Sequence, residues 1–249
     1  MKRCLSVLGV IFFLAAPLPA LAKHAHIISL GGHGTTQAII FRGRAQSGKP
    51  SKGAIGKGRL GKLASTAHAF MRNDLEHVRI RVVDVESRRT IDQATDDEGF
   101  YRIPFPGPFS PGKKIFQVLL VSRKYKAEPI LVPVIVVEAS KPGLVVLADI
   151  DDTIAHTGVP DGALSVAARA SISNSEDMRP IPHAAKLLSL LEERGVPVLY
   201  VSAGPVELAP RTKDFLARNG FPAGPLFLRY YEDEGIKNPG RYKRAVVAG

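Results

Sequence analysis

Three carboxylates and a hydroxyl follow directly on the apolar run Leu144–Ala148: Asp149, Asp151, Asp152 and Thr153. A continuous apolar run of this length is typical of a buried parallel strand, and open α/β sheets bind ligands beyond the carboxyl ends of such strands. Carboxylates crowded at that point repel one another unless a cation neutralises them. Mg²⁺ is the cation that combines a few carboxylate oxygens with substrate phosphate. The run predicts a Mg²⁺-assisted phosphate site, and a plain acidic turn that caps the next element is the alternative.

The pattern Asp-x-Asp-x-Thr over residues 149–153 resembles the first motif of the haloacid dehalogenase-like (HAD) phosphotransferases. The longer string over 149–158 resembles one branch of them, the phosphatidate phosphatase catalytic-domain family, whose founding member is a yeast actin-patch protein. Two more blocks, over residues 200–216 and 219–229, follow in the order found in this family. Three blocks in order over residues 144–229 are far more specific than the first motif alone.

The resemblance implies a role for each of four side chains. Asp149 resembles the nucleophile that takes the phosphoryl group, and Asp151 the general acid/base; covalent catalysis of this kind splits one hard displacement into two easier ones. The same two aspartates are the implied ligands of Mg²⁺. Ser202 resembles the hydroxyl that hydrogen-bonds the transferring phosphoryl group. Lys243 resembles the lysine that balances charge on the phosphoryl oxygens, with Lys237 as the second choice.

The resemblance also implies four substrate-binding residues, which are Thr153, Ala203, Gly204 and Arg229. The chain departs from the family's pattern in this region, since Ala203-Gly204 stands where Asn-Ser is common and Arg229-Tyr230 where Arg-Asp is common. The family's fourth motif, an acidic Gly-Asp-Ser-Gly-type loop that completes the metal site, does not follow Lys243. We therefore expect a C-terminally incomplete phosphatase domain or an incomplete metal site.

The order of the expected elements divides the chain into four parts. Residues 1–22 read as a signal peptide, and residues 23–58 as a basic flexible segment with one short strand over 37–44. Residues 59–140 read as a helix followed by a β-sandwich accessory domain, and residues 141–249 as the HAD-like domain. Strands and helices alternate in the last part, which is the signature of a parallel sheet. The predicted fold is thus α/β, an incomplete HAD-like Rossmannoid parallel sheet preceded by a small antiparallel β-sandwich.

The first residues predict export. Met-Lys-Arg precedes an apolar run over Cys4–Leu18, and Ala20-Leu21-Ala22 forms a small-x-small cleavage site. The apolar run is shorter than the roughly 20 residues that a membrane span needs. We expect a periplasmic or secreted protein that is cleaved after Ala22.

Charge is concentrated near the expected mature N-terminus. The chain has a formal net charge of +11, and residues 23–73 contain nine Lys or Arg and no Asp or Glu. This basic segment favours an anionic membrane surface. Nucleic acid is not expected as a partner, because the aromatic residues that single-strand binders interleave with basic ones are missing. A solvated arm is the simpler alternative.

These features together predict an exported Mg²⁺-dependent phosphatase that acts on a phospholipid or another phosphate ester. Phosphatidate is the substrate that the resemblance implies, because the residues themselves indicate only a phosphate ester. Two alternatives stay open: a general phosphomonoesterase, and a non-catalytic envelope-binding protein with a degenerate or truncated HAD domain.

Overall fold

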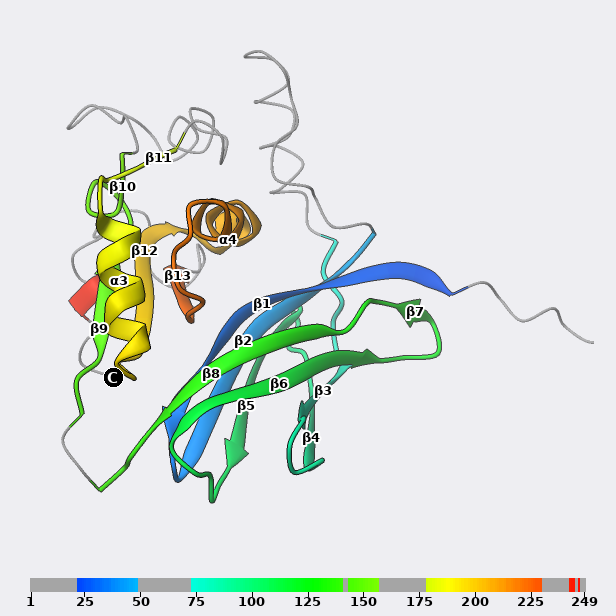
Figure 1. Cartoon of the computed structure of the whole chain (residues 1–249). Coiled ribbons are helices and arrows are strands. Elements are labelled where there is room, and N and C mark those ends of the chain that lie inside the picture. The colour runs from blue at the N-terminus through cyan, green and yellow to red at the C-terminus, as the bar shows by residue number, and fades with distance from the viewer. Residues whose placement is uncertain are drawn as a thin grey trace, which may run out of the picture.

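The computed structural model describes residues 22–48, 73–140, 143–156, 178–229, 242–244 and 246. Within these ranges the chain forms a large β-sheet from its first half and a smaller three-stranded sheet with two helices from its second half (Figure 1). The described residues leave out most of the predicted signal peptide, residues 59–72 of the expected accessory helix, and Lys237. Among the described residues, no helix has the length and apolar character to cross a bilayer.

The large sheet contains eight strands in the order β4-β3-β6-β8-β1-β2-β5, with β7 paired to β1. Their bounds are β1 Lys23–Thr35, β2 Ala38–Ser47, β3 Arg79–Asp84, β4 Thr90–Ala94, β5 Phe100–Pro106, β6 Gly112–Val121, β7 Tyr125–Lys126 and β8 Ile130–Val137. Neighbours are antiparallel except where β1 runs parallel to β7 and β8. The sheet curls into a nearly closed barrel-like shape, which we call the β barrel.

Alternation along the strands builds the core of the β barrel. Strand β3 buries every second residue, as the period of two in a strand requires. Four phenylalanines pack edge-on or tilted against one another at its centre, with ring centroids 4.8–6.4 Å apart: Phe41, Phe105, Phe109 and Phe116. Such pairs add to the stabilisation from buried area, so this cluster holds β2, β5 and β6 together.

The second half forms a parallel sheet in the order β13-β12-β9, with β9 Val146–Asp149, β12 Val198–Pro205 and β13 Leu226–Arg229. The helices are α3 Ala184–Glu193 and α4 Ala209–Arg218, a 3-10 turn (η1, Val206–Leu208) precedes α4, and β10 Ala155–His156 pairs with β11 Arg179–Pro180. The expected strand over 144–149 is shorter than predicted, because Leu144 and Val145 are exposed and pairing begins at Val146.

The predicted fold class is wrong. Half of the structure is β-strand and only 16% is helix, and the parallel part has three strands, of which β9 and β13 have four residues each. An α/β Rossmann-type fold needs a longer parallel sheet with helices on both faces. The expected antiparallel β-sandwich is also absent from the described residues, because β1 joins β8 and β2 into one mixed sheet. Strand β1 also lies in the segment expected to be flexible, whereas β2 covers most of the short strand expected over 37–44.

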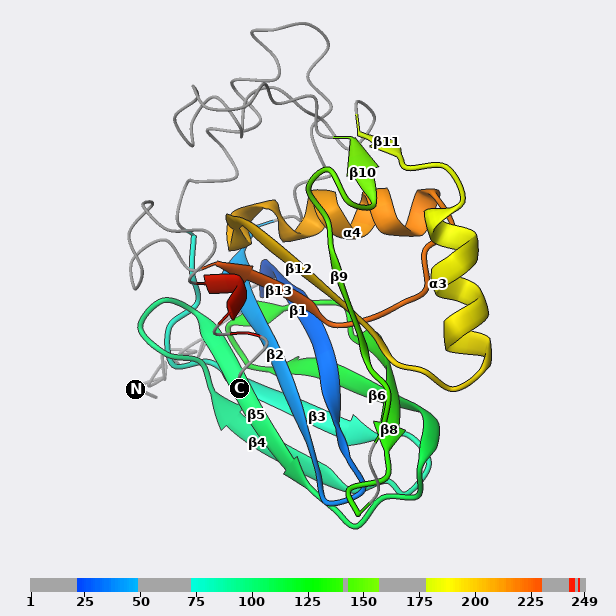
Figure 2. The same cartoon turned by 90° about the vertical axis from the view of Figure 1, so that its left-hand side faces the viewer.

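The β barrel packs directly against the parallel sheet. Leu30 and Phe100 of the barrel are buried in one apolar cluster with Ala148, Tyr200 and Leu228 of the second half, and Figure 2 shows β13 lying beside β1 and β2. At Gly31 the two backbones meet: a Cβ added there would lie 2.6 Å from Pro225 Cα. Gly31 also has a φ of +95°. Only glycine satisfies both conditions without strain.

We expect Gly31→Ala to lower the free energy of unfolding by about 1–3 kcal/mol, since it adds a clash with Pro225 to an unfavourable φ. Gly48→Ala is the matched control, because Gly48 has a φ of +94° and nothing within 4 Å of an added Cβ. Urea denaturation of both variants measures the difference. Equal losses in the two variants would mean that the close approach at Pro225 does not constrain the interface.

Candidate active site

Asp149 and Lys243 form the centre of the candidate site, although they stand 94 positions apart. Asp149 is the last residue of β9, and Lys243 lies in a short helical stretch over 242–244. The Lys243 Nζ is 2.7 Å from Asp149 Oδ1 and 2.8 Å from Oδ2. About a third of each side chain is exposed, 31% for Asp149 and 32% for Lys243. The pair thus provides a partly accessible carboxylate held by an ammonium group.

The turn after Asp149 folds tightly on the carbonyl oxygen of Ile150. That oxygen accepts hydrogen bonds from the backbone N–H groups of Thr153, Ile154 and Ala155. Asp152 adopts a φ of +55°, a left-handed conformation that Asp tolerates better than most residues. The Thr153 Oγ1 lies 3.5 Å from Asp149 Oδ2. The turn therefore brings a hydroxyl to the edge of hydrogen-bonding distance from the carboxylate.

Ser202 connects the second strand to the same turn. Its hydroxyl donates a 2.6 Å hydrogen bond to Asp151 Oδ2 and accepts one of 2.9 Å from the Gly204 N–H. A Cβ on Gly204 would lie 3.1 Å from the Ser202 Oγ, tighter than an ordinary van der Waals contact. The small residue at 204 therefore leaves room for the Ser202 hydroxyl, which in turn fixes one carboxylate oxygen of Asp151.

Strand register explains why these groups meet. Asp149 pairs with Val201 in β12, and Val201 pairs with Phe227 in β13. The Ile150 N–H continues the ladder by donating to the Val201 carbonyl at 3.0 Å. Because all three strands are parallel, their carboxyl ends lie at one edge of the sheet. The polar residues at and just beyond the ends of β9 and β12 gather there.

The remaining predicted residues are placed less closely. Arg229 ends β13 and is buried, at 6% exposure, and its strand position pairs with Pro205 rather than with the aspartates. Ala203 lies in the same strand end as Ser202. Six of the predicted residues thus form two hydrogen-bonded sets at this edge, Asp149 with Thr153 and Lys243, and Ser202 with Asp151 and Gly204. Arg229 lies two strands from Asp149. The roles of these residues stay predictions.

The donor atoms at this edge suit Mg²⁺. Carboxylate oxygens of Asp149 and Asp151 are hard ligands, and Mg²⁺ in proteins uses one or two carboxylates together with water and substrate phosphate. Among the described residues, no group of three or more His, Cys, Asp or Glu side chains is arranged to hold a metal ion. The two carboxylates of this turn match the one or two that Mg²⁺ takes in proteins.

One buried ion-pair network escaped sequence reasoning. Arg44 of β2 lies between Asp74, at 2.6 Å, and Glu207 of η1, at 3.2 Å, with its side chain 5% exposed. Its guanidinium also lies 4.5 Å from the centroid of the Phe100 ring. Glu207 follows the end of β12 by two residues, so this network ties the β barrel to the turn that follows the strand of Ser202. A single arginine in a basic segment gives no sign of such partners.

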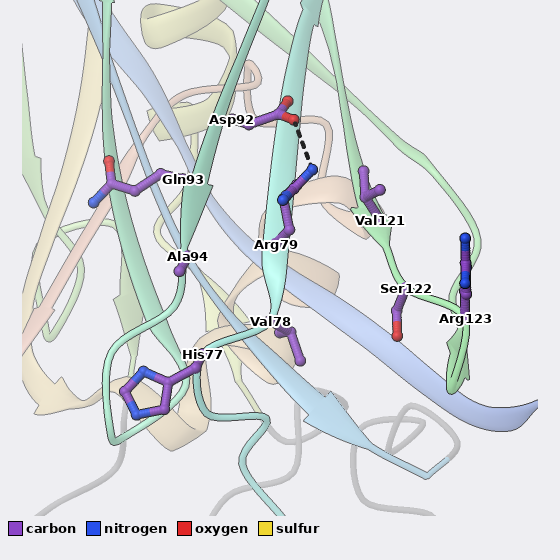
Figure 3. Close-up of a pocket in the computed structure, with 9 residues that line it drawn as sticks. All are labelled: His77, Val78, Arg79, Asp92, Gln93, Ala94, Val121, Ser122 and Arg123. Atoms are coloured by element: carbon purple, nitrogen blue, oxygen red, sulfur yellow. Dashed lines mark ion pairs between the residues drawn. The ribbon is translucent and has the colours of Figure 1, made fainter.

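A surface hollow of about 740 Å³ lies elsewhere on the β barrel. Figure 3 shows its lining residues, which come from β3, β4, β6 and the adjoining loops and include His77, Arg79 and Arg123. Arg79 points toward Asp92, at 4.0 Å. None of the predicted catalytic residues lines this hollow, so it is separate from the candidate site.

Comparison with known proteins agrees with the motifs. Residues 144–248 match the family model described as phosphatidate phosphatase APP1, catalytic domain. The chain is 33% identical over 91 residues to phosphatidate phosphatase APP1 of Saccharomyces cerevisiae. The matched region covers 36% of this chain and 15% of the yeast protein. The predicted resemblance to the phosphatidate phosphatase catalytic-domain family is confirmed. Asp149, Ser202 and Lys243 all lie within the region that matches the phosphatidate phosphatase family model.

Similarity to solved structures is weak. A biofilm-associated protein BSP domain matches with 11% identity and a TM-score of 0.27 over 49% of this chain and 16% of that one. The Yersinia pseudotuberculosis adhesin InvE matches with 10% identity and a TM-score of 0.26 over 46% and 32%. The chitinase ChiW of Paenibacillus sp. str. FPU-7 matches with 8% identity and a TM-score of 0.28 over 90% and 22%. These scores support no conclusion about fold or function.

We expect Arg44→Leu to lower the free energy of unfolding by about 3–5 kcal/mol, because it leaves two buried carboxylates without their cation. The matched control is Arg81→Leu, which removes an exposed strand arginine paired with Asp92 at 2.7 Å and is expected to change stability little. Thermal unfolding of the three proteins measures both effects. A similar, small shift in both variants would show that the Arg44 network does not hold the two halves together.

Proposed function

We propose that this protein is a Mg²⁺-dependent phosphatidate phosphatase that works through an aspartyl-phosphate on Asp149. The observation that carries the proposal is the pair of contacts at the carboxyl ends of β9 and β12, where Lys243 contacts Asp149 and Ser202 contacts Asp151. The match of residues 144–248 to the phosphatidate phosphatase family supports the choice of substrate. The chain spans 15% of the length of the yeast relative, so the substrate and the reaction are both part of the proposal.

In the first step, a carboxylate oxygen of Asp149 attacks the phosphorus atom and the bond to the leaving alkoxide breaks. Asp151 gives its proton to that alkoxide and releases diacylglycerol. The hydrogen bond from Ser202 holds one Asp151 oxygen, which leaves the other oxygen to carry the proton. Lys243 lies close enough to Asp149 to balance the negative charge that the phosphoryl oxygens bring to this carboxylate.

In the second step, the Asp151 carboxylate takes a proton from water, and the resulting hydroxide attacks the phosphorus of the aspartyl-phosphate. The bond between Asp149 and phosphorus breaks, and inorganic phosphate leaves. Asp149 and Asp151 would hold Mg²⁺, which, when bound, supplies positive charge to the phosphate oxygens. Thr153 is within reach of the same carboxylate and is suited to hydrogen-bond a phosphoryl oxygen.

We expect the protein to release phosphate from phosphatidate in mixed micelles with Mg²⁺ and to release none when EDTA replaces it. Asp149→Asn should remove turnover, because an amide is a poor nucleophile. The control is Asp152→Asn, which removes the same charge three positions farther along the chain. Asp152 has a φ of +55°, a conformation that Asn also adopts. Turnover that survives Asp149→Asn would end the covalent mechanism.

We also propose that the protein is exported and that residues 1–22 are removed. The support is the basic start, the apolar run over Cys4–Leu18 and the Ala20-Leu21-Ala22 site. In the structure, β1 begins at Lys23, so cleavage after Ala22 would leave the β barrel complete.

We expect N-terminal sequencing of the exported protein to begin at Lys23. Ala22→Arg should block processing, because signal cleavage requires small residues at this position, and Lys23→Arg, which preserves the charge after the site, should not. An N-terminus at Met1 in the native protein would contradict cleavage.

A further inference from the structure

We propose that His33 and Arg42, which lie against the ring of Phe227, form with Arg102 a second anion-binding site beside the Asp149–Lys243 pair, and that its ligand is a phospholipid head-group phosphate. The proposal that this site binds an anion is argued from the side chains alone. The choice of a lipid as the source of the phosphate rests on the function proposed above.

Strand pairing places the two arginines together. Arg42 of β2 stands directly opposite Arg102 of β5 in antiparallel register, where side chains on one face lie about 5 Å apart. Two guanidinium groups at this separation can each donate a pair of hydrogen bonds to one phosphate.

The site is partly shielded from water by Phe227 of β13. The Arg42 guanidinium lies 5.5 Å from the centroid of this ring, and the His33 ring lies 5.2 Å from it at an interplanar angle of 58°. His33 and Arg42 are half-buried, while Arg102 is exposed. Burial lowers the pKa of His33, and the charges of Arg42 and Arg102 lower it further. The cluster therefore combines two half-buried side chains packed against an aromatic ring with one exposed arginine.

Register also places the cluster beside the candidate active site. Asp149, Val201 and Phe227 are paired across the parallel sheet, so their side chains point to the same face. Two strand spacings separate the backbones of Asp149 and Phe227, roughly 10 Å. Phosphatidate carries a single phosphate, so a phosphate at this second site belongs to a neighbouring lipid when the first lies at Asp149. The cluster would thus hold the active face against an anionic bilayer.

The test measures binding, which needs no turnover. The full chain is titrated with inorganic phosphate and, separately, with short-chain phosphatidylglycerol, a phosphodiester that the reaction does not consume. The readout is the NMR signal of the His33 imidazole, assigned with His33→Gln. A shift with phosphatidylglycerol alone supports a head-group site, and a shift with both ligands supports the same anion chemistry for free phosphate as well. No shift with either ligand overturns the proposal.

Vesicle binding tests the arginines. We expect Arg42→Gln/Arg102→Gln to weaken binding to phosphatidylglycerol vesicles roughly tenfold or more, given the contribution of each basic residue near a charged bilayer. Arg79→Gln/Arg123→Gln makes the same change of charge at the hollow shown in Figure 3 and should have much less effect. Equal loss in both double variants would mean general charge attraction and would overturn the site. If the double variant does not fold, the same measurement is made on Arg102→Gln alone, which changes an exposed side chain.

Failure of this proposal is distinguishable from failure of the proposed function. If the protein releases phosphate from phosphatidate but the His33 signal does not shift, the proposed phosphatase activity is supported and the second site is contradicted. If the His33 signal shifts but the protein releases no phosphate, the anion-binding site is supported and the proposed phosphatase activity is contradicted.

Discussion

The parallel register of β9, β12 and β13 determines which chemical groups can meet in this protein. Asp149, Val201 and Phe227 lie in one row across the sheet. The residues that follow them along each strand therefore lie at one edge of the sheet. A shift of one residue in the pairing would turn every side chain of that strand to the other face. Asp149 would then lose Lys243 and enter the apolar cluster that contains Ala148 and Ile150. The row is held from both sides, by buried residues such as Tyr200 and Leu228 on one face and by the Asp149–Lys243 pair on the other.

The β barrel is part of this arrangement rather than an attached module. A parallel sheet with two four-residue strands buries little apolar area by itself. Leu30 and Phe100 of the barrel supply part of the missing core, and Arg44 reaches Glu207 just after the Ser202 strand end. The approach of Gly31 to Pro225 allows these contacts because no side chain separates the two backbones. The β barrel thus helps to bury the apolar residues of the short sheet, as additional parallel strands and helices do in a larger α/β fold.

The motif residues were predictable and the architecture around them was not. Asp149, Ser202 and Lys243 belong to a recognisable pattern, because a phosphoryl-transfer site restricts the residue types it uses, and the structure brings them within hydrogen-bonding distance of one another or of Asp151. Strand β1 escaped prediction because its sequence is rich in Gly and His, with a bulge between Ser29 and Gly31 that breaks the alternation. Its place between β8 and β2 depends on partners about a hundred residues away. Local patterns carry no information about such pairing, so the fold class was wrong even where the motifs were placed.

Strand β2 shows how one charged sequence serves two purposes. Arg42 and Arg44 are two residues apart and therefore lie on the same face of the strand. Arg44 meets two carboxylates and a phenylalanine ring in a nearly dry interface, where its charge is matched within the fold. Arg42 meets Phe227 and stands beside Arg102, where the fold adds a second positive charge. Composition alone counts both as part of one basic segment over residues 23–73. Only the strand pairing shows that Arg44 is held by two carboxylates, whereas Arg42 stands opposite a second arginine.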